Sequence, residues 1–432
     1  MGHDQFQKQE GRILTTSFFV LLSLSLLGIV LIAVRCVKGI GAVSNMSDGY
    51  PWGIWIAYDV ATGTAIACGG YAVAILVYIR NHMRYHPLIR SCILTSMFGY
   101  GLAGFSVMVD LGRPWNAYNF FVPSKWQVNS AMFEVALCVM AYSTVLIIEF
   151  LPAILYSLET SRWRRLQMIM TSLQPVFAPD KEAVLGKIGY VRAAAAWLRP
   201  RLEKVLIFII VLGITLPTMH QSSLGSMLLI AATKLHPLWH SPLLPLFFLI
   251  NCIYIGYSIA ILESVISSYA FQRPYEIRQL SGLAGIIPWL ATLWLAVVVG
   301  DLSWRGQLGA VWRFDLYSFF FLLEFALLGF GSLILFSNQN RHSPRWLFVS
   351  AALIVLGGAL YRFNVYLIGF NPGQGWSYFP SLAEVMISVG IVTIELLGYQ
   401  VLVKTVPVLP RIGLHRHPHA RPLCIPAAPS IS

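Results

Sequence analysis

Three residues, Tyr100, Glu134 and His220, can exchange protons and lie in or at the edge of apolar segments. Glu134 follows a stretch dense in aromatic residues, and Tyr100 lies in the run GYGLAG, whose small residues allow close helix approach. A buried carboxyl group and an imidazole near neutrality both carry replaceable protons. Reduction of a quinone to a quinol consumes two electrons and two protons, so this trio at one membrane surface would suit a quinone site.

Acids inside apolar segments are costly if they stay charged in lipid, so each should face the bundle interior, be paired or be protonated. The acids concerned are Asp59, Glu134, Glu149, Glu263, Glu324 and Glu395, with Asp110, Asp301 and Glu384 near segment ends. For Glu149, Glu324 and Glu395 a hydrogen bond to a neighbouring helix is a sufficient explanation, and we expect structural roles for them.

The elements that must position these residues are membrane-spanning helices. Of the 432 residues, 57% are apolar or aromatic and only 11% are charged, whereas a soluble protein spends about a quarter of its residues on charge. This composition excludes a soluble globular enzyme, a disordered protein and a disulfide scaffold, and it indicates an all-α integral membrane protein. Ten continuously apolar runs have about the length needed to cross the bilayer. They cover residues 13–34, 54–79, 91–111, 128–151, 205–219, 244–270, 283–300, 314–337, 346–370 and 382–403.

The distribution of positive charge predicts the orientation of the chain. With both termini in the cytoplasm, 22 of the 30 Lys and Arg residues fall in inner segments, seven fall in outer loops, and Arg362 lies within a helix. This division gives a short N-terminal tail (1–12), a ten-helix domain (13–405) with one long cytoplasmic loop (about 152–203), and a basic C-terminal tail (406–432). The basic segments of the long loop can lie at the membrane surface as amphipathic helices.

Five predicted outer loops are rich in Gly, Pro, Trp and Asn rather than in Lys and Glu. They cover residues 48–55, 110–126, 217–226, 236–242 and 370–380. Short connections explain the Gly and Pro, but not the number of aromatic residues. We therefore predict a partner-docking or ligand-gating face on the outside, which includes Trp52, Asp110, Arg113 and Trp115.

Metal and haem ligands are scarce in the predicted spans. No two of the six cysteines lie within ten residues of each other, so the sequence offers no CxxC pair for zinc or an Fe–S cluster. A bis-histidine haem needs imidazoles projecting from the middle of facing helices. Only His220 lies at the edge of a predicted span, and the other histidines fall in loops or tails. The sequence therefore predicts no metal, no Fe–S cluster and no haem in this chain.

Several of these segments also resemble a known family. The runs DGYPWGIWIAYDVATGTAIACGGYAVA, FGYGLAG, NSAMFE, PTMHQSSLGSM, KLHPLW and FNPGQGWSYFP resemble the NrfD/polysulfide-reductase membrane subunits, specifically the hydrogenase-2-type branch, which is often labelled b-type cytochrome. The resemblance extends from about residue 13 to 410. It implies two four-helix bundles plus flanking helices in the bacterial inner membrane, and again no metal.

The resemblance also implies a function. A ferredoxin-like Fe–S subunit and the small and large NiFe hydrogenase subunits would deliver electrons on the periplasmic face, and this chain would pass them to menaquinone or ubiquinone, coupled to proton movement. Tyr100, Glu134 and His220 would be quinone-region and proton-relay positions. Glu263 and, more weakly, Asp59 and Asp110 would belong to a proton path, with Arg362 as a counter-ion for one of these acids.

Three other functions remain open. A NrfD-like subunit could serve a different donor, such as a molybdopterin enzyme. A secondary transporter is less favoured, because the Pro and Gly clusters lie at the predicted outer surface rather than at mid-membrane. A passive anchor for the hydrogenase has no need for acids such as Glu134 and Glu263. Nucleic acid is not an expected partner, since the Lys and Arg residues are distributed among the loops in the pattern that sets membrane orientation.

Overall fold

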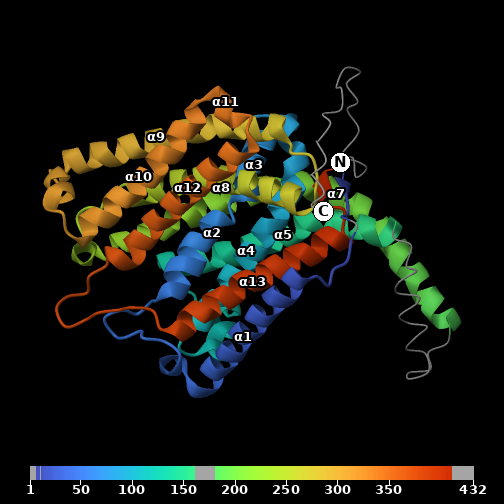
Figure 1. The fold of residues 1–432 in the computed structure, drawn as a ribbon. Helices are drawn as coiled ribbons and strands as arrows, with labels where there is room; N and C mark the ends of the chain where they lie inside the picture. Colours follow the sequence, from blue (N-terminus) through green and yellow to red (C-terminus); the bar gives the residue numbers. More distant parts are fainter. Residues whose placement is uncertain (1–5, 10, 161–180, 411–432) are drawn as a thin grey trace, which may run out of the picture.

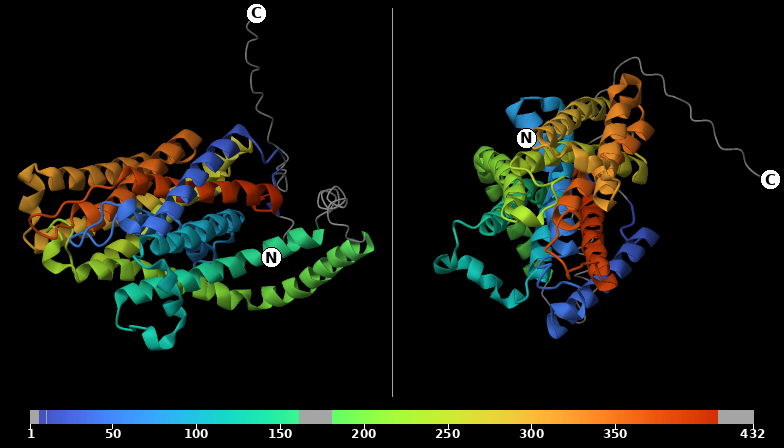
Figure 2. Two further views of the ribbon diagram at one scale, coloured as in Figure 1. Left: turned by 90° about the horizontal axis from the view of Figure 1, so that it is seen from below. Right: turned by 90° about the vertical axis from the view of Figure 1, so that its left-hand side faces the viewer.

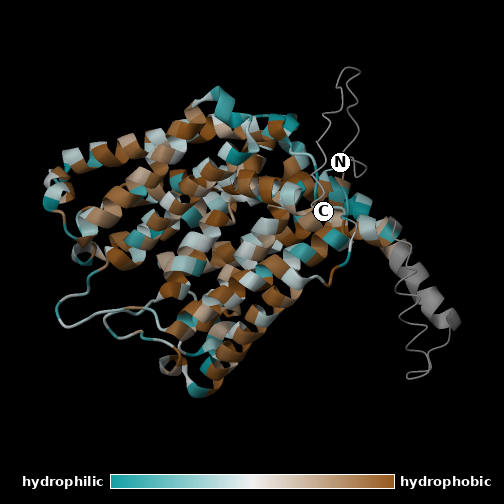
Figure 3. Cartoon of the chain, viewed as in Figure 1, coloured by the Kyte–Doolittle hydropathy of each residue, from teal (hydrophilic) through white to brown (hydrophobic). Residues whose placement is uncertain are grey.

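The structure is a computed structural model, which describes residues 6–9, 11–160 and 181–410. Within these ranges, ten helices are long and apolar enough to cross a membrane, which confirms the predicted fold class. Figure 3 shows apolar residues along the helices and polar residues mainly at turns and ends. Helices suit the bilayer because they satisfy every backbone polar group within one segment.

The spanning helices follow one another along the chain (Figure 1). They are α1 (Thr16–Lys38); a composite helix, called helix 55–79, made of η3 (Trp55–Thr62), α2 (Gly63–Ile66), α3 (Gly69–Ala74) and η4 (Ile75–Ile79); α4 (Ile89–Asp110), preceded by η5 (Met83–Leu88); α5 (Ala131–Thr160); α7 (Lys181–Leu229); α8 (Leu244–Ala270); α9 (Ile277–Trp304); α10 (Leu316–Phe336); α12 (Pro344–Phe363), continued by η10 (Asn364–Ile368); and α13 (Leu382–Thr405). Short helices in the connections are η2 (Ile40–Ala42), η6 (Pro114–Phe121), η7 (Pro123–Lys125), η8 (Ala232–Lys234), η9 (Leu308–Arg313) and α11 (Asn338–Arg341).

The helices form two four-helix bundles and a flanking pair. Helix 55–79, α4, α5 and α7 pack together as the first bundle, and α8, α9, α10 and α12 pack as the second. Helix α8 also contacts α3 and α7, which joins the two bundles. The flanking helices α1 and α13 pack on each other, and α13 leans against α4. Figure 2 shows α5 and α7 side by side along much of their length.

The two ends of the described chain meet on one face. Strand β1 (Phe6–Gln7) pairs antiparallel with β2 (Leu409–Pro410), with Phe6 opposite Pro410. We call the face that carries this pair the inner face and the opposite one the outer face. The charge distribution predicts that the inner face is cytoplasmic, and that orientation stays a prediction.

Two predicted boundaries on the fifth span are wrong. The span is not 205–219 but Ala193–Leu229, within the 49-residue α7. The segment 217–226 is therefore helix and not an outer loop. Its hydroxyl groups are satisfied inside the helix, since Thr218, Ser222 and Ser223 each donate to the carbonyl four residues earlier.

The predicted loop 152–203 is also shorter than expected. Helix α5 continues to Thr160 and α7 begins at Lys181. One of the two predicted interfacial segments, 162–170, and the histidine-rich tail lie outside the described residues, within 161–180 and 411–432. The other segment, 181–202, forms the first part of α7.

Candidate functional site

Tyr100 and His220 meet in the interior of the first bundle. Tyr100 on α4 and His220 on α7 are both fully buried, and their rings make an edge contact with centroids 5.6 Å apart. Tyr142 on α5 packs edge-on against the other side of Tyr100, at 4.5 Å. His220 therefore lies nine residues before the end of α7 and inside the first bundle, and not at the outer end of a span as predicted.

The imidazole of His220 has unusual surroundings for a buried polar group. Neither Nδ1 nor Nε2 has a hydrogen-bond partner among the described residues. Most buried polar atoms in proteins are hydrogen-bonded, and an orphaned one often marks a functional site or an unseen water or ligand. Both nitrogens of His220 are thus available to a group that enters the bundle.

Glu134 is linked to α7 one turn after His220. Its Oε1 accepts a hydrogen bond of 2.8 Å from the hydroxyl of Ser223. Ser223 is three residues after His220, so the two side chains leave α7 on the same side. Glu134 is in the first turn of α5, which begins at Ala131 rather than at 128 as predicted. The structure thus brings Tyr100, Glu134 and His220 into one region of the first bundle, in its outer half.

A hydrogen-bond network supports Tyr100. The side-chain amide of Gln221 donates to the Tyr100 hydroxyl and to Thr64 Oγ1, at 3.2 Å each. The thiol of Cys68 lies 3.3 Å from the same hydroxyl. Gln221 Oε1 has no partner among the described residues, so this site also keeps an unused acceptor.

Sequence reasoning missed Tyr142, Thr64 and the role of Cys68 in this network. Cys68 was interpreted as a small hydrophobic residue, and the other two have no charge to draw attention in an apolar run. One signal was present: Tyr142 follows Glu134 by eight residues, a spacing that places both on about the same face of a helix.

The predicted proton-path residues lie outside this cluster. Asp59, on helix 55–79, accepts a 2.9 Å hydrogen bond from Ser388 on α13. Glu263, on α8, accepts one of 2.9 Å from Tyr399 on α13, and its other oxygen is buried without a partner in the described part of the chain. Both acids face the flanking helix α13 rather than the centre of the first bundle.

Arg362 does not act as a counter-ion in this structure. Its fully buried guanidinium donates to Asn251 Oδ1 at 2.5 Å, to the Ala61 carbonyl at 2.8 Å and to the Phe248 carbonyl at 2.7 Å. None of the ion pairs among the described residues includes it. The prediction of an acidic partner is wrong because neutral oxygens from α8 and helix 55–79 satisfy the guanidinium.

The four residues of the predicted docking face have different surroundings. Trp115 is 65% exposed and Arg113 is also exposed, in and next to η6. Trp52 instead packs on Phe370, with centroids 4.8 Å apart, and donates to the Tyr366 carbonyl. Asp110 has a buried, unpartnered oxygen. Of these four residues, only Arg113 and Trp115 are therefore exposed enough to meet a partner.

Metal ligands do not gather anywhere in the described ranges. No group of three or more His, Cys, Asp and Glu side chains there is arranged to hold a metal ion.

Sequence comparisons place these features in a wider group. The profile of the family described as "Polysulphide reductase, NrfD" matches residues 42–371. The chain is 38% identical over 420 residues to the "Probable Ni/Fe-hydrogenase 2 b-type cytochrome subunit" of Escherichia coli (strain K12), covering 96% of this chain and 98% of that relative.

Two relatives from Nitratidesulfovibrio vulgaris (strain Hildenborough) also match. One, named only "Protein", is 32% identical over 401 residues, which is 89% of this chain and 92% of its own length. The other, "Menaquinone reductase, integral membrane subunit", is 27% identical over 146 residues, which is 33% of each chain.

The name of the Escherichia coli relative contradicts the prediction that this chain carries no haem, because a b-type cytochrome is a haem protein. That prediction rested on the lack of two mid-helix histidines in the sequence.

The histidines that the structure describes do not fit a bis-histidine haem. The buried ones are His220 and His86. His86 precedes Tyr100, the ring neighbour of His220, by 14 residues, or roughly 20 Å of helix. The two imidazoles therefore cannot reach one iron.

Proposed function

Because this chain belongs to the polysulphide reductase NrfD family, we propose that it is the quinone-reactive membrane subunit of a respiratory hydrogen:quinone oxidoreductase. It would not cleave hydrogen itself. It would receive electrons at its outer face and reduce menaquinone or ubiquinone inside the first bundle. The proposal places it in a bacterial inner membrane, with the inner face towards the cytoplasm.

The proposed electron donor is a NiFe hydrogenase with its Fe–S subunits. The supporting observation is the 38% identity, over nearly the whole chain, to a subunit named for Ni/Fe-hydrogenase 2. A ferredoxin-like Fe–S subunit would lie on the outer face, near the exposed Arg113 and Trp115. Aromatic and Arg side chains are enriched in protein interfaces, which makes η6 a suitable contact.

The observation that carries the proposal is the pair of unpartnered nitrogens on His220 beside the Ser223–Glu134 hydrogen bond. Reduction of one quinone consumes two electrons from the Fe–S donor and two protons, which add to its two carbonyl oxygens. His220 would hydrogen-bond one oxygen, and Glu134 would replace the proton that is used. Tyr100, held by Gln221, would orient the ring.

One observation supports an electron donor other than a hydrogenase. The partly matching relative named "Menaquinone reductase, integral membrane subunit" is a membrane subunit, and its name mentions no hydrogenase. The same quinone chemistry could thus serve another oxidoreductase, such as a molybdopterin enzyme. The identity over one third of the chain is lower than for the hydrogenase-named relative, so the hydrogenase is the proposed donor.

The test is Glu134→Gln in the intact complex. Hydrogen-dependent quinone reduction should fall by about 10²-fold or more, the range for loss of a proton-transfer group, while hydrogen oxidation with an artificial dye should be unchanged. Glu159→Gln is the matched control, because Glu159 lies at the other end of the same helix and pairs with Arg199. Equal loss of both activities, or no loss of either, would refute the role of Glu134.

A further inference from the structure

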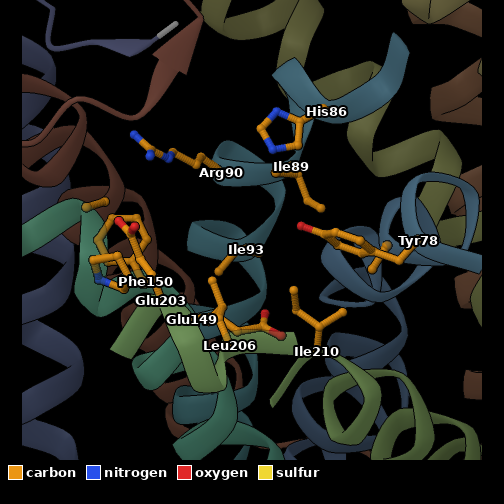
Figure 4. A pocket seen from close by; sticks show the side chains of 13 residues that line it. Tyr78, His86, Ile89, Arg90, Ile93, Glu149, Phe150, Glu203, Leu206 and Ile210 are labelled. Atoms are coloured by element: carbon orange, nitrogen blue, oxygen red, sulfur yellow. The ribbon is translucent and has the colours of Figure 1, made fainter. Parts of the chain in front are cut away.

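A pocket opens at the inner end of the first bundle, far from the site just described. All four helices of the bundle line it, together with η5 (Figure 4). Its walls are mostly aliphatic and aromatic, and its polar lining residues are Tyr78, His86, Arg90, Glu149 and Glu203. Figure 4 shows Tyr78 with its hydroxyl turned into the pocket. The pocket therefore combines apolar walls with a few polar and ionisable side chains at the inner end of the bundle.

The pocket lies beneath the paired chain ends. Arg90, one of its lining residues, stacks over the Phe6 ring at 3.9 Å and donates to the Pro407 carbonyl at 3.2 Å. These two contacts place the pocket at the inner face. Glu149 follows Glu134 by 15 residues on α5, so the pocket and the outer site are separated by roughly 22 Å of helix.

The carboxyl group of Glu149 occupies space that a glycine provides. A Cβ atom added at Gly213, on the facing helix α7, would lie 2.8 Å from Glu149 Oε1. The carboxyl thus fits against bare α7 backbone inside the bundle and lines the pocket at the same time. Glu149 is therefore an acid on the wall of a pocket at the inner end of the bundle.

Polar side chains continue from this carboxyl towards the outer site. Glu134, Tyr142 and Glu149 are spaced by eight and seven residues, which places them on about one face of α5. On the opposite wall, the Tyr71 hydroxyl hydrogen-bonds Thr218 Oγ1 at 2.8 Å. Tyr142 then contacts Tyr100, whose own contacts lead to His220. A series of hydroxyl-bearing side chains therefore crosses the otherwise apolar core of this bundle between the two sites.

We propose that the inner pocket is the proton entry of this subunit and that Glu149 is its first proton acceptor. The inference rests on the proposed quinone reduction at the outer site. A proton from water in the pocket would protonate the Glu149 carboxylate. It would then pass along bridging water and the Tyr142 and Tyr100 hydroxyls to His220 and Glu134. Two such transfers balance the two protons added to each quinone. Glu263 and Asp59, which face α13, lie outside this series of side chains.

The test uses the complete complex reconstituted in liposomes with a quinone. Glu149→Gln should lower hydrogen-driven quinone reduction at least tenfold, leave dye reduction unchanged and raise the solvent deuterium isotope effect above the wild-type value. The isotope effect matters because loss of structure alone would not make proton transfer rate-limiting. Glu395→Gln, which changes a partly buried acid on α13 outside the pocket, is the control and should retain the wild-type rate.

Gly213→Ala is the second variant. It keeps the acid but pushes its carboxyl aside, and the rate should fall several-fold with the complex still assembled. It therefore decides the question if Glu149→Gln does not assemble. Wild-type rates in both variants, with Glu134→Gln still inactive, would overturn the proton entry and leave the proposed function standing. Wild-type rates in all three would overturn both.

Discussion

Ser223 on α7 and Glu134 on α5 are joined by a 2.8 Å hydrogen bond inside the first bundle. Because Ser223 also donates to the Met219 carbonyl, its hydroxyl is shared between its own helix and the carboxyl opposite. The bond holds the Glu134 carboxyl near His220, and its donor is a neutral hydroxyl group. It is a positioning contact for the proposed proton donor.

Ser223→Ala should therefore reduce hydrogen-dependent quinone reduction several-fold, since it removes a bond worth about 1 kcal/mol and frees the Glu134 carboxyl to turn away. Ser222→Ala is the control, because Ser222 donates only to backbone carbonyls of its own helix. The measurement is the KM and kcat for quinone in both variants. A structural role alone would lower assembly and dye reduction as well, and that result would contradict the positioning role.

The sequence predicted the general arrangement well because the bilayer leaves few choices. Apolar runs of fixed length must become helices, so most predicted spans agree with the structure. Where polar residues interrupt a run, this logic fails. The segment after Pro217 was interpreted as a loop, yet Thr218 and Ser222 satisfy their hydroxyls on α7 itself and the helix continues.

The candidate site was predictable only in part. Glu134 and His220 were predicted because acids and imidazoles are rare in apolar segments, and Tyr100 because it lies in the run GYGLAG. Their exact neighbours were not, since contacts between α4, α5 and α7 depend on helix rotation. Glu149 was interpreted as structural for the same reason: the sequence does not show that Gly213 faces it or that a pocket opens beside it.

A buried guanidinium links the two bundles, and its loss should destabilise the fold. Arg362→Met would remove three hydrogen bonds from a charged donor, each worth about 1.5–3 kcal/mol, and we expect a lower thermal midpoint in detergent. Arg362→Lys should rescue only partly, because one ammonium cannot reproduce the planar fork. A wild-type midpoint for the Met variant would show that the three hydrogen bonds do not stabilise the fold.

The flanking helices depend on a contact between two glycines. A Cβ atom at Gly390 on α13 would lie 2.7 Å from Gly28 Cα on α1, which is backbone and cannot turn away. Gly390→Ala should thus cost about 1–3 kcal/mol through overpacking and lower the thermal midpoint. Gly329→Ala on α10, where a Cβ meets nothing within 4 Å, should leave it unchanged. Equal midpoints for the two variants would contradict close packing of α1 on α13.

The connection before α8 should respond to pH through His236. Burial lowers the pKa of His236 below its ordinary value, with Asp315 acting in the opposite direction. Its Nδ1 accepts a hydrogen bond from the Leu238 amide, which requires the unprotonated nitrogen. The unfolded chain thus binds a proton more readily, so this contribution to stability is present above about pH 6.5 and is lost as the pH falls.

The corresponding measurement compares thermal midpoints at pH 7.5 and pH 5.5. The wild-type midpoint should fall more steeply between them than that of His236→Asn, whose side chain does not titrate but can still offer an acceptor to the Leu238 amide. Because other groups also titrate in this window, only the difference between the two slopes reports on His236. Parallel slopes would remove His236 as a source of the pH dependence.

The orientation of the chain can be tested at two positions on opposite faces. In a Cys36→Ser, Cys424→Ser background, which removes the exposed thiol among the described residues and the one in the C-terminal tail, Arg113→Cys should react with a membrane-impermeant maleimide added to intact spheroplasts. Lys8→Cys, next to β1, should react only after the membrane is opened. Labelling in the reverse order would place the inner face outside. It would then move the proposed proton entry at Glu149 to the periplasmic side, so that quinone reduction could no longer take protons from the cytoplasm.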